Sequence, residues 1–145
     1  MVRFKVGVAF LYPQPFFAFH QVTHISASHS HICVITEDSL VQRWGTDKQR
    51  ENGPPPDLGP VSQIATGHYH TCAIKTDDLV QCWGENDKRQ STPPPDLGRV
   101  SHISSGAFHS CAITIDGFVY CWGDNSRGQC MPPTNFKALL HNPRR

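Results

Sequence analysis

A 39-residue spacing that recurs three times along this 145-residue chain limits its fold more than any other feature. Val22, Val61 and Val100 each begin a unit, and PPPDLG joins the units at 54–59 and again at 93–98. The same spacing relates four further sets of residues: His31, His70 and His109; Cys33, Cys72 and Cys111; Trp44, Trp83 and Trp122; and Gly45, Gly84 and Gly123. Repetition at this period indicates supersecondary units that bury their apolar faces by stacking on one another.

Within a unit the local pattern predicts three strands. Residues 61–65 alternate between apolar and polar types, 69–74 form a second apolar run, and 79–83 form a third that Gly84 ends. No stretch inside the repeats has helical periodicity. We therefore expect an all-β fold with mostly antiparallel strands. The chain divides into an N-terminal segment 1–21, three repeats over 22–133 (22–60, 61–99 and 100–133), and a tail 134–145.

The turn between the second and third strands can be predicted in more detail. In the third unit, a three-residue loop at 115–117 places Gly117 where a left-handed residue is needed, and Asp78 takes that position in the second unit. A two-residue loop would instead put the cysteines on opposite faces. The three-residue register places two pairs of cysteines opposite each other: Cys72 with Cys82, and Cys111 with Cys121.

These residues allow a family to be named as a resemblance. Segments 67–74 and 106–113, each followed by a Cys-Trp-Gly strand end, resemble the repeat of the regulator of chromosome condensation. That repeat also occurs in a bacterial β-lactamase-inhibitor protein, a plant UV-B photoreceptor and many ubiquitin ligases, and its cysteine-containing form resembles plant receptor-kinase ectodomains. The resemblance covers about 22–133 and implies blades of a seven-bladed β-propeller with four strands each. We therefore expect an incomplete β-propeller.

Three units leave two open ends, whereas ring closure normally protects the edges of a propeller. The chain is then an arc of a larger ring, a self-associating fragment, or a subunit whose open faces are covered by other proteins. The first unit departs most from the pattern: Ser28 replaces a glycine, Arg43 replaces the second cysteine, and 51–52 is Glu-Asn in place of Gly-Gln. Such departures are typical of a terminal repeat.

The cysteines admit two interpretations. Cys72 with Cys82 and Cys111 with Cys121 form disulfides if the compartment is oxidising, or they are small buried thiols between blades. Cys33 and Cys130 fall outside these pairs. No Cys-x-x-Cys occurs, so no structural zinc site is predicted. The compartment itself is not determined by the sequence.

The histidines also admit two interpretations. His29, His31 and Cys33 alternate along one strand face, as do the residues at 68, 70 and 72, and this spacing can present metal ligands together. The resemblance instead implies that His31, His70 and His109 are structural, with rings that hydrogen-bond neighbouring backbone. We follow the second interpretation and predict neither a metal nor a cofactor.

The repeated tryptophans are expected to be core residues, because each buries a large area. In the plant photoreceptor the sensing tryptophans lie two residues before the repeating histidine. Those positions hold His29, His68 and Ala107 here, which argues against a photoreceptor.

No catalytic constellation is recognised. Asp77, Asp78 and Asp116 fall in hairpin turns, where aspartate is favoured for local hydrogen bonding. The formal net charge is +1, and the scattered basic residues do not form a nucleic-acid-binding stripe. We expect no enzyme activity, no small-molecule substrate and no nucleic-acid partner.

The N-terminal segment carries two positive charges within its first five residues and then an apolar run over 6–19. That order resembles a targeting segment, but Pro13 and Pro15 would break its helix. The alternative is an apolar arm with four phenylalanines that contact a partner or a membrane surface: Phe10, Phe16, Phe17 and Phe19.

The expected function is a non-catalytic protein–protein interaction or structural module: a propeller arc completed by partner proteins or by self-association. One alternative is a small accessory subunit of a large membrane-associated assembly, such as a photosynthetic one. Another is a regulator of guanine-nucleotide exchange, since the founding member of the family promotes exchange on a small GTPase. That activity resides in loops of a full ring, whereas this chain matches only the generic repeat.

Overall fold

The computed structural model describes residues 19–46, 53–133 and 136, which form nine strands in three separate antiparallel sheets. Blade 1 holds β1 (Val22–Ala27), β2 (His31–Thr36) and β3 (Val41–Gly45). Blade 2 holds β4 (Val61–Thr66), β5 (His70–Lys75) and β6 (Val80–Gly84), and blade 3 holds β7 (Val100–Ser105), β8 (His109–Thr114) and β9 (Val119–Gly123). The prediction of an all-β, incomplete propeller is confirmed. The interpretations of Phe10, Phe16 and Phe17 lie outside the described residues.

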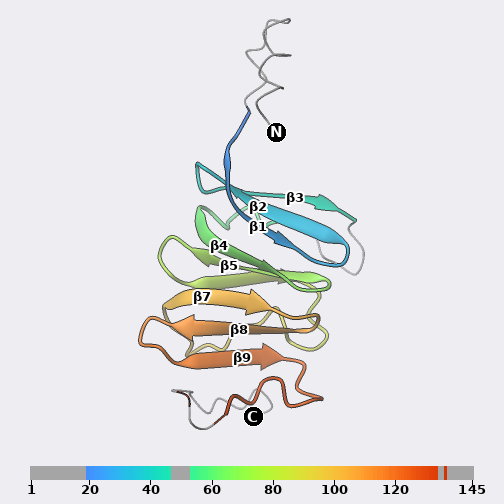
Figure 1. Ribbon diagram of the computed structural model, residues 1–145, viewed down its shortest axis with the longest axis vertical. Helices are drawn as coiled ribbons and strands as arrows, with labels where there is room; N and C mark the ends of the chain where they lie inside the picture. Colours follow the sequence, from blue (N-terminus) through green and yellow to red (C-terminus); the bar gives the residue numbers. More distant parts are fainter. Residues whose placement is uncertain (1–18, 47–52, 134–135, 137–145) are drawn as a thin grey trace, which may run out of the picture.

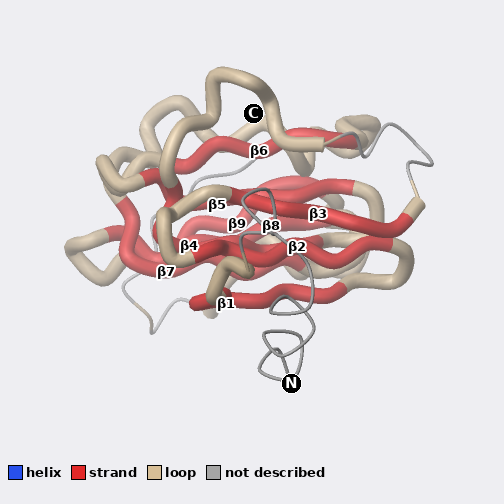
Figure 2. The backbone as a smooth tube through the Cα atoms, turned by 90° about the horizontal axis from the view of Figure 1, so that it is seen from above, coloured by secondary structure: helices blue, strands red, loops and turns tan. Residues whose placement is uncertain are grey.

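Each blade is a simple meander in which the second strand lies in the middle, and the three blades stack in chain order (Figure 1). Seen from above, β1, β4 and β7 lie along one side of the stack (Figure 2). The blades approach each other most closely there: β4 contacts both β1 and β2, and β7 contacts both β4 and β5. Propeller blades have this relation around a common centre.

The described blades have three strands each, whereas the family resemblance implied four. After β6 the chain passes through Pro93, Pro94 and Pro95, which lie outside any strand. Proline has no N–H to donate to a sheet, so this run cannot supply a ladder. The prolines instead lead into Leu97, which is buried between blades 2 and 3, as Leu58 is between blades 1 and 2.

The hydrophobic core lies between blades rather than within them. Two clusters occupy equivalent repeat positions except for Ile64 in the first and Tyr120 in the second. Between blades 1 and 2 the cluster is Cys33, Ile35, Leu58, Val61, Ile64, Ala73 and Trp83. Between blades 2 and 3 it is Cys72, Ile74, Leu97, Val100, Ala112, Tyr120 and Trp122. Each blade therefore depends on its neighbour to bury its apolar side chains.

A bulge modifies the predicted alternation of the first strands. The pairing register shifts between Val61 and Gln63, and the same shift occurs in the other two blades. Without it, Val61 and Ile64 would point to opposite faces, since side chains alternate along a strand. With it, both join the cluster against blade 1.

The predicted hairpin turn is confirmed. The Thr114 amide donates to the Phe118 carbonyl over 2.8 Å, and Cys111 faces Cys121 as Cys72 faces Cys82. Gly117 has a φ of 88°, and its counterparts Ser39 and Asp78 have φ of 68° and 69°.

The turn gives a stability prediction. A Cβ at Gly117 would have open space around it, so the only expected cost of Gly117→Ala is the strain of alanine in a left-handed backbone conformation. We expect this substitution to lower the free energy of unfolding by about 1 kcal/mol. Gly117→Asn should cost less, because asparagine tolerates this conformation. Urea unfolding measures both. A larger loss for asparagine than for alanine would contradict the account.

Candidate functional site

The two ends of the stack form the candidate site. We call the side of a blade that faces the preceding blade its leading face, and the opposite side its trailing face. Blade 1 has no described blade before it, and blade 3 has none after it (Figure 1). The 39-residue repeat allows each position on these end faces to be compared with its equivalent between blades.

On the leading face of blade 1, large apolar side chains are uncovered. Trp44 is 51% exposed, whereas the equivalent Trp83 and Trp122 are 8% and 2% exposed. Ile25 is 69% exposed, against 9% for the equivalent Ile64. The expectation that the tryptophans are core residues is therefore confirmed for Trp83 and Trp122 and wrong for Trp44, because no described blade packs against Trp44.

The trailing face of blade 3 shows the same contrast. Ile113 is 40% exposed, although the equivalent Ile35 and Ile74 are almost completely buried. Phe136 stands 39 residues after Leu97, which is buried, and yet Phe136 is exposed. Both end faces thus present apolar side chains that the joints between blades bury.

A hydrogen bond from the repeating histidine crosses each joint between blades. The Nε2 atom of His31 lies 2.9 Å from the Thr71 hydroxyl, and Nε2 of His70 lies 2.9 Å from the Ser110 hydroxyl. The expected bond to neighbouring backbone is wrong for His70, whose other ring nitrogen has no hydrogen-bond partner. Its ring lies against Gly67, where a Cβ would fall on the ring, and this packing turns Nε2 toward the next blade.

The backbone carbonyl of Gln90 accepts two further hydrogen bonds at the joint between blades 2 and 3. It accepts from the Ser110 hydroxyl over 3.2 Å and from the Trp122 indole N–H over 2.9 Å. Because Ser110 donates to Gln90, it accepts from His70, which requires a proton on Nε2 of that ring. Sequence reasoning missed the roles of Thr71, Ser110 and Gln90. The 39-residue recurrence of a hydroxyl after His70 and His109 was the available signal.

The pKa of His70 is lowered to about 4, first because burial disfavours the charged ring and then because His109 and His31 flank it. The ring is therefore neutral at neutral pH. This agrees with the hydrogen-bond chain, in which the second ring nitrogen stays without a partner.

The cysteine pairs lie on trailing faces. Disulfides join Cys72 to Cys82, at the joint with blade 3, and Cys111 to Cys121, on the open face of blade 3. Cys33 and Cys130 are buried outside these bonds, and burial raises the pKa of the Cys130 thiol to about 11. In blade 1, Arg43 stands opposite Cys33, so this cross-link has no counterpart there.

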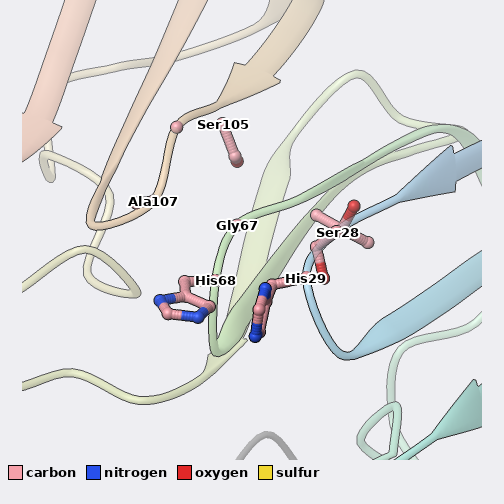
Figure 3. A pocket seen from close by; sticks show the side chains of 8 residues that line it. Ser28, His29, Gly67, His68, Ser105 and Ala107 are labelled. Carbon is pink, nitrogen blue, oxygen red and sulfur yellow. The ribbon is translucent and has the colours of Figure 1, made fainter.

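A cavity of about 400 Å³ lies where the turns between the first and second strands of the blades meet. His29 and His68 line it with Ala107 beyond them, and the two imidazoles are in edge contact at 4.8 Å (Figure 3). His31 turns away to Thr71, so the alternating residues His29, His31 and Cys33 do not converge. No three His, Cys, Asp or Glu residues of the described segments are placed to hold a metal ion.

Two of the hairpin aspartates have polar partners. Asp77 accepts from the Leu79 amide in its own turn, and Asp78 forms an exposed ion pair at 2.7 Å with Arg99, directly before β7. Across the described segments, no helix has the length and apolarity to span a membrane.

Comparison with known proteins identifies the repeat. The model for the regulator of chromosome condensation (RCC1) repeat matches residues 61–90 and 100–129. These two segments are RCC1 repeats, as the sequence resemblance predicted. No curated protein sequence matches the chain.

Solved structures agree on the fold. Similar chains include Prp20p of Saccharomyces cerevisiae (TM-score 0.66, 20% identity, covering 83% of this chain and 34% of that one). The ectodomain of the Arabidopsis thaliana receptor kinase ACR4 is similar as well (TM-score 0.61, 26% identity, 74% and 40%). So is that of the Physcomitrella patens receptor kinase CR4 (TM-score 0.62, 21% identity, 75% and 32%). The chain therefore spans about a third of the length of these proteins.

The histidine chain gives a pH prediction. Between the ordinary histidine pKa of 6.5 and the folded value of about 4, the unfolded chain binds more protons than the folded one. Stability therefore falls as pH drops through this window, by roughly 3 kcal/mol in all at His70. Urea unfolding from pH 7.5 to 4 measures the slope.

The matched control is the exposed His102. His70→Gln should flatten the pH slope while lowering stability at pH 7.5, and His102→Gln should leave the slope as it is. An unchanged slope in His70→Gln would show that the pH dependence has another origin.

Proposed function

We propose that this protein is a non-catalytic interaction module: an arc of three propeller blades whose two end faces bind protein partners. The observation that carries the proposal is the contrast between equivalent positions, which are buried at the joints and exposed at the ends. Trp44 and Ile25 show this contrast on the leading face of blade 1, and Ile113 and Phe136 show it on the trailing face of blade 3.

The chemistry of these faces suits protein partners. Exposed tryptophan and isoleucine gathered on one side of a sheet favour contact with another apolar surface, and tryptophan is enriched among residues that dominate binding energy. The joints inside the chain show that such faces are covered by sheet packing and a few directed hydrogen bonds. Nothing in the described residues resembles a catalytic constellation.

The structural neighbours support protein binding in general. Prp20p was described with its binding to Gsp1p and histones, and in another structure with Kap60 bound to it. At 20% identity it supports the fold of this chain and not those partners. Nucleotide-exchange activity and an accessory role in a membrane-associated assembly remain hypotheses that no described contact favours.

Two further proposals accompany this function. The division into segment 1–21, repeats 22–133 and tail 134–145 assigns the binding faces to the repeats, with the phenylalanine-rich arm as an additional contact. The two disulfides favour an oxidising compartment, since such bonds persist there.

Photocrosslinking in the native source tests the proposed function. A benzophenone amino acid replaces Trp44 on the leading face or, as a control, Leu79 in the turn after β5. Leu79 is 40% exposed and its equivalent Leu40 is 47% exposed, so exposure there does not depend on a neighbouring blade. We expect a discrete cross-linked protein from position 44 and none from position 79.

Two outcomes would count against the proposal. Equal labelling at positions 44 and 79 would indicate nonspecific contact. The absence of any protein adduct at position 44 would indicate that this face is not an interface.

A further inference from the structure

The joint between blades 2 and 3 shows what the open trailing face of blade 3 is built to receive, and the inference rests on the proposed function. At that joint, blade 2 offers the His70 ring, the Gln90 carbonyl and the apolar surface of Ile74. Blade 3 contributes the Ser110 hydroxyl, the Trp122 indole N–H and apolar side chains to the same joint. Each polar group on one side thus has a specific partner on the other.

Blade 3 carries the same set on its trailing face. His109, Ile113 and Gln129 stand 39 residues after His70, Ile74 and Gln90. The two glutamines are held alike: Gln129 donates to Asp124 over 3.1 Å as Gln90 donates to Glu85 over 2.9 Å. The backbone carbonyl of Gln129 is therefore positioned before any partner arrives.

Local packing at His109 is similar in part. A Cβ at Gly106 would fall on the His109 ring, as a Cβ at Gly67 would fall on the His70 ring, but the nearer ring nitrogen is Nε2 in His109 and Nδ1 in His70. Beside His109 opens a hollow of about 560 Å³ along the edge of blade 3, lined by Phe108, Asp124 and Gln129 and also by Lys88 from the loop after β6. The trailing face of blade 3 thus resembles the side that blade 2 contributes to the joint between blades 2 and 3.

The leading face of blade 1 is an imperfect match for it. Trp44 repeats Trp122, but Ile32 stands where Thr71 and Ser110 carry the hydroxyl. If blade 1 of a second copy covered blade 3, His109 would meet a hydrocarbon side chain instead of an acceptor. A polar group that is buried without a partner loses its bonds to water and gains none in return.

We propose that the trailing face of blade 3 binds the leading face of an RCC1-type blade on another protein, one with serine or threonine at the position of Ile32 and tryptophan at that of Trp44. Ile32 disfavours a second copy of this chain as the occupant. The pattern that identifies the partner is therefore a hydroxyl residue twelve positions before a Trp-Gly strand end, the spacing of Thr71 to Trp83 and of Ser110 to Trp122.

Two variants of the full chain convert its own leading face into a test probe. Ile32→Thr supplies the hydroxyl. Ile32→Val is the matched control, because valine has nearly the same shape as threonine but carries no hydroxyl. Sedimentation equilibrium measures self-association of each variant and of the wild type. We expect Ile32→Thr to associate head to tail with a dissociation constant on the order of tenfold lower than that of Ile32→Val, the usual effect of one hydrogen bond.

A second substitution assigns that gain to His109. In the Ile32→Thr background, His109→Ala should return association to the Ile32→Val level. His102→Ala, at an exposed histidine on β7, should leave the gain in place. Circular dichroism and mapping of the two disulfides establish that each variant is folded.

The outcomes separate this inference from the proposed function. If Ile32→Thr and Ile32→Val sediment alike, as monomers or as assemblies, the inference is wrong. It is also wrong if the wild type associates through these faces as tightly as Ile32→Thr, although that result would support the proposed function. Failure of the proposed function itself appears separately, as the absence of an adduct at position 44.

Discussion

The packing of one blade against the next is the interaction on which the rest of this structure depends. Each sheet has three strands and two faces, and the apolar residues of the chain are buried at the joints between sheets. A single blade would leave its apolar faces in water. The three described blades make two joints and leave two faces without a described neighbour, so the same property that stabilises the arc makes these faces candidates for binding.

The joints combine nonspecific and directed contacts. Leu58 and Leu97, which follow the proline runs, add buried apolar area, and this contact makes no demand for a particular partner side chain. The bonds from His31 to Thr71 and from His70 to Ser110 need a hydroxyl at one position. Burial keeps the His70 ring neutral, so this directed bond is coupled to pH. A blade that fits by shape alone would leave the ring without its acceptor.

Repeat spacing and turn chemistry made much of the fold predictable from the sequence. The 39-residue period defined the blades, and Gly117 and Asp78 predicted the three-residue turn, whose register places the cysteines opposite each other. The fourth strand of a family blade is not found in the described blades, because the proline run lacks the N–H groups that a ladder needs. The bulge that turns both Val61 and Ile64 toward blade 1 gave no sequence signal that we recognised.

The candidate site was less predictable. The open ends followed from the number of repeats. The exposure of Trp44, however, depends on whether a blade packs against the leading face of blade 1, and the sequence pattern around Trp44 does not contain that information. The repeating histidine was expected to hydrogen-bond the neighbouring backbone, whereas the hydrogen-bond acceptor of His70 is Ser110, 40 residues along the chain. Contacts of this kind arise only when two repeats are placed face to face.

Oxidative footprinting of the three repeat tryptophans tests the central claim, that the end faces are covered when the protein functions. In the isolated chain, Trp44 should be oxidised readily while Trp83 and Trp122 are protected. In the native extract, Trp44 should become as protected as the other two. Equal oxidation of Trp44 in the isolated chain and in the extract would contradict the account.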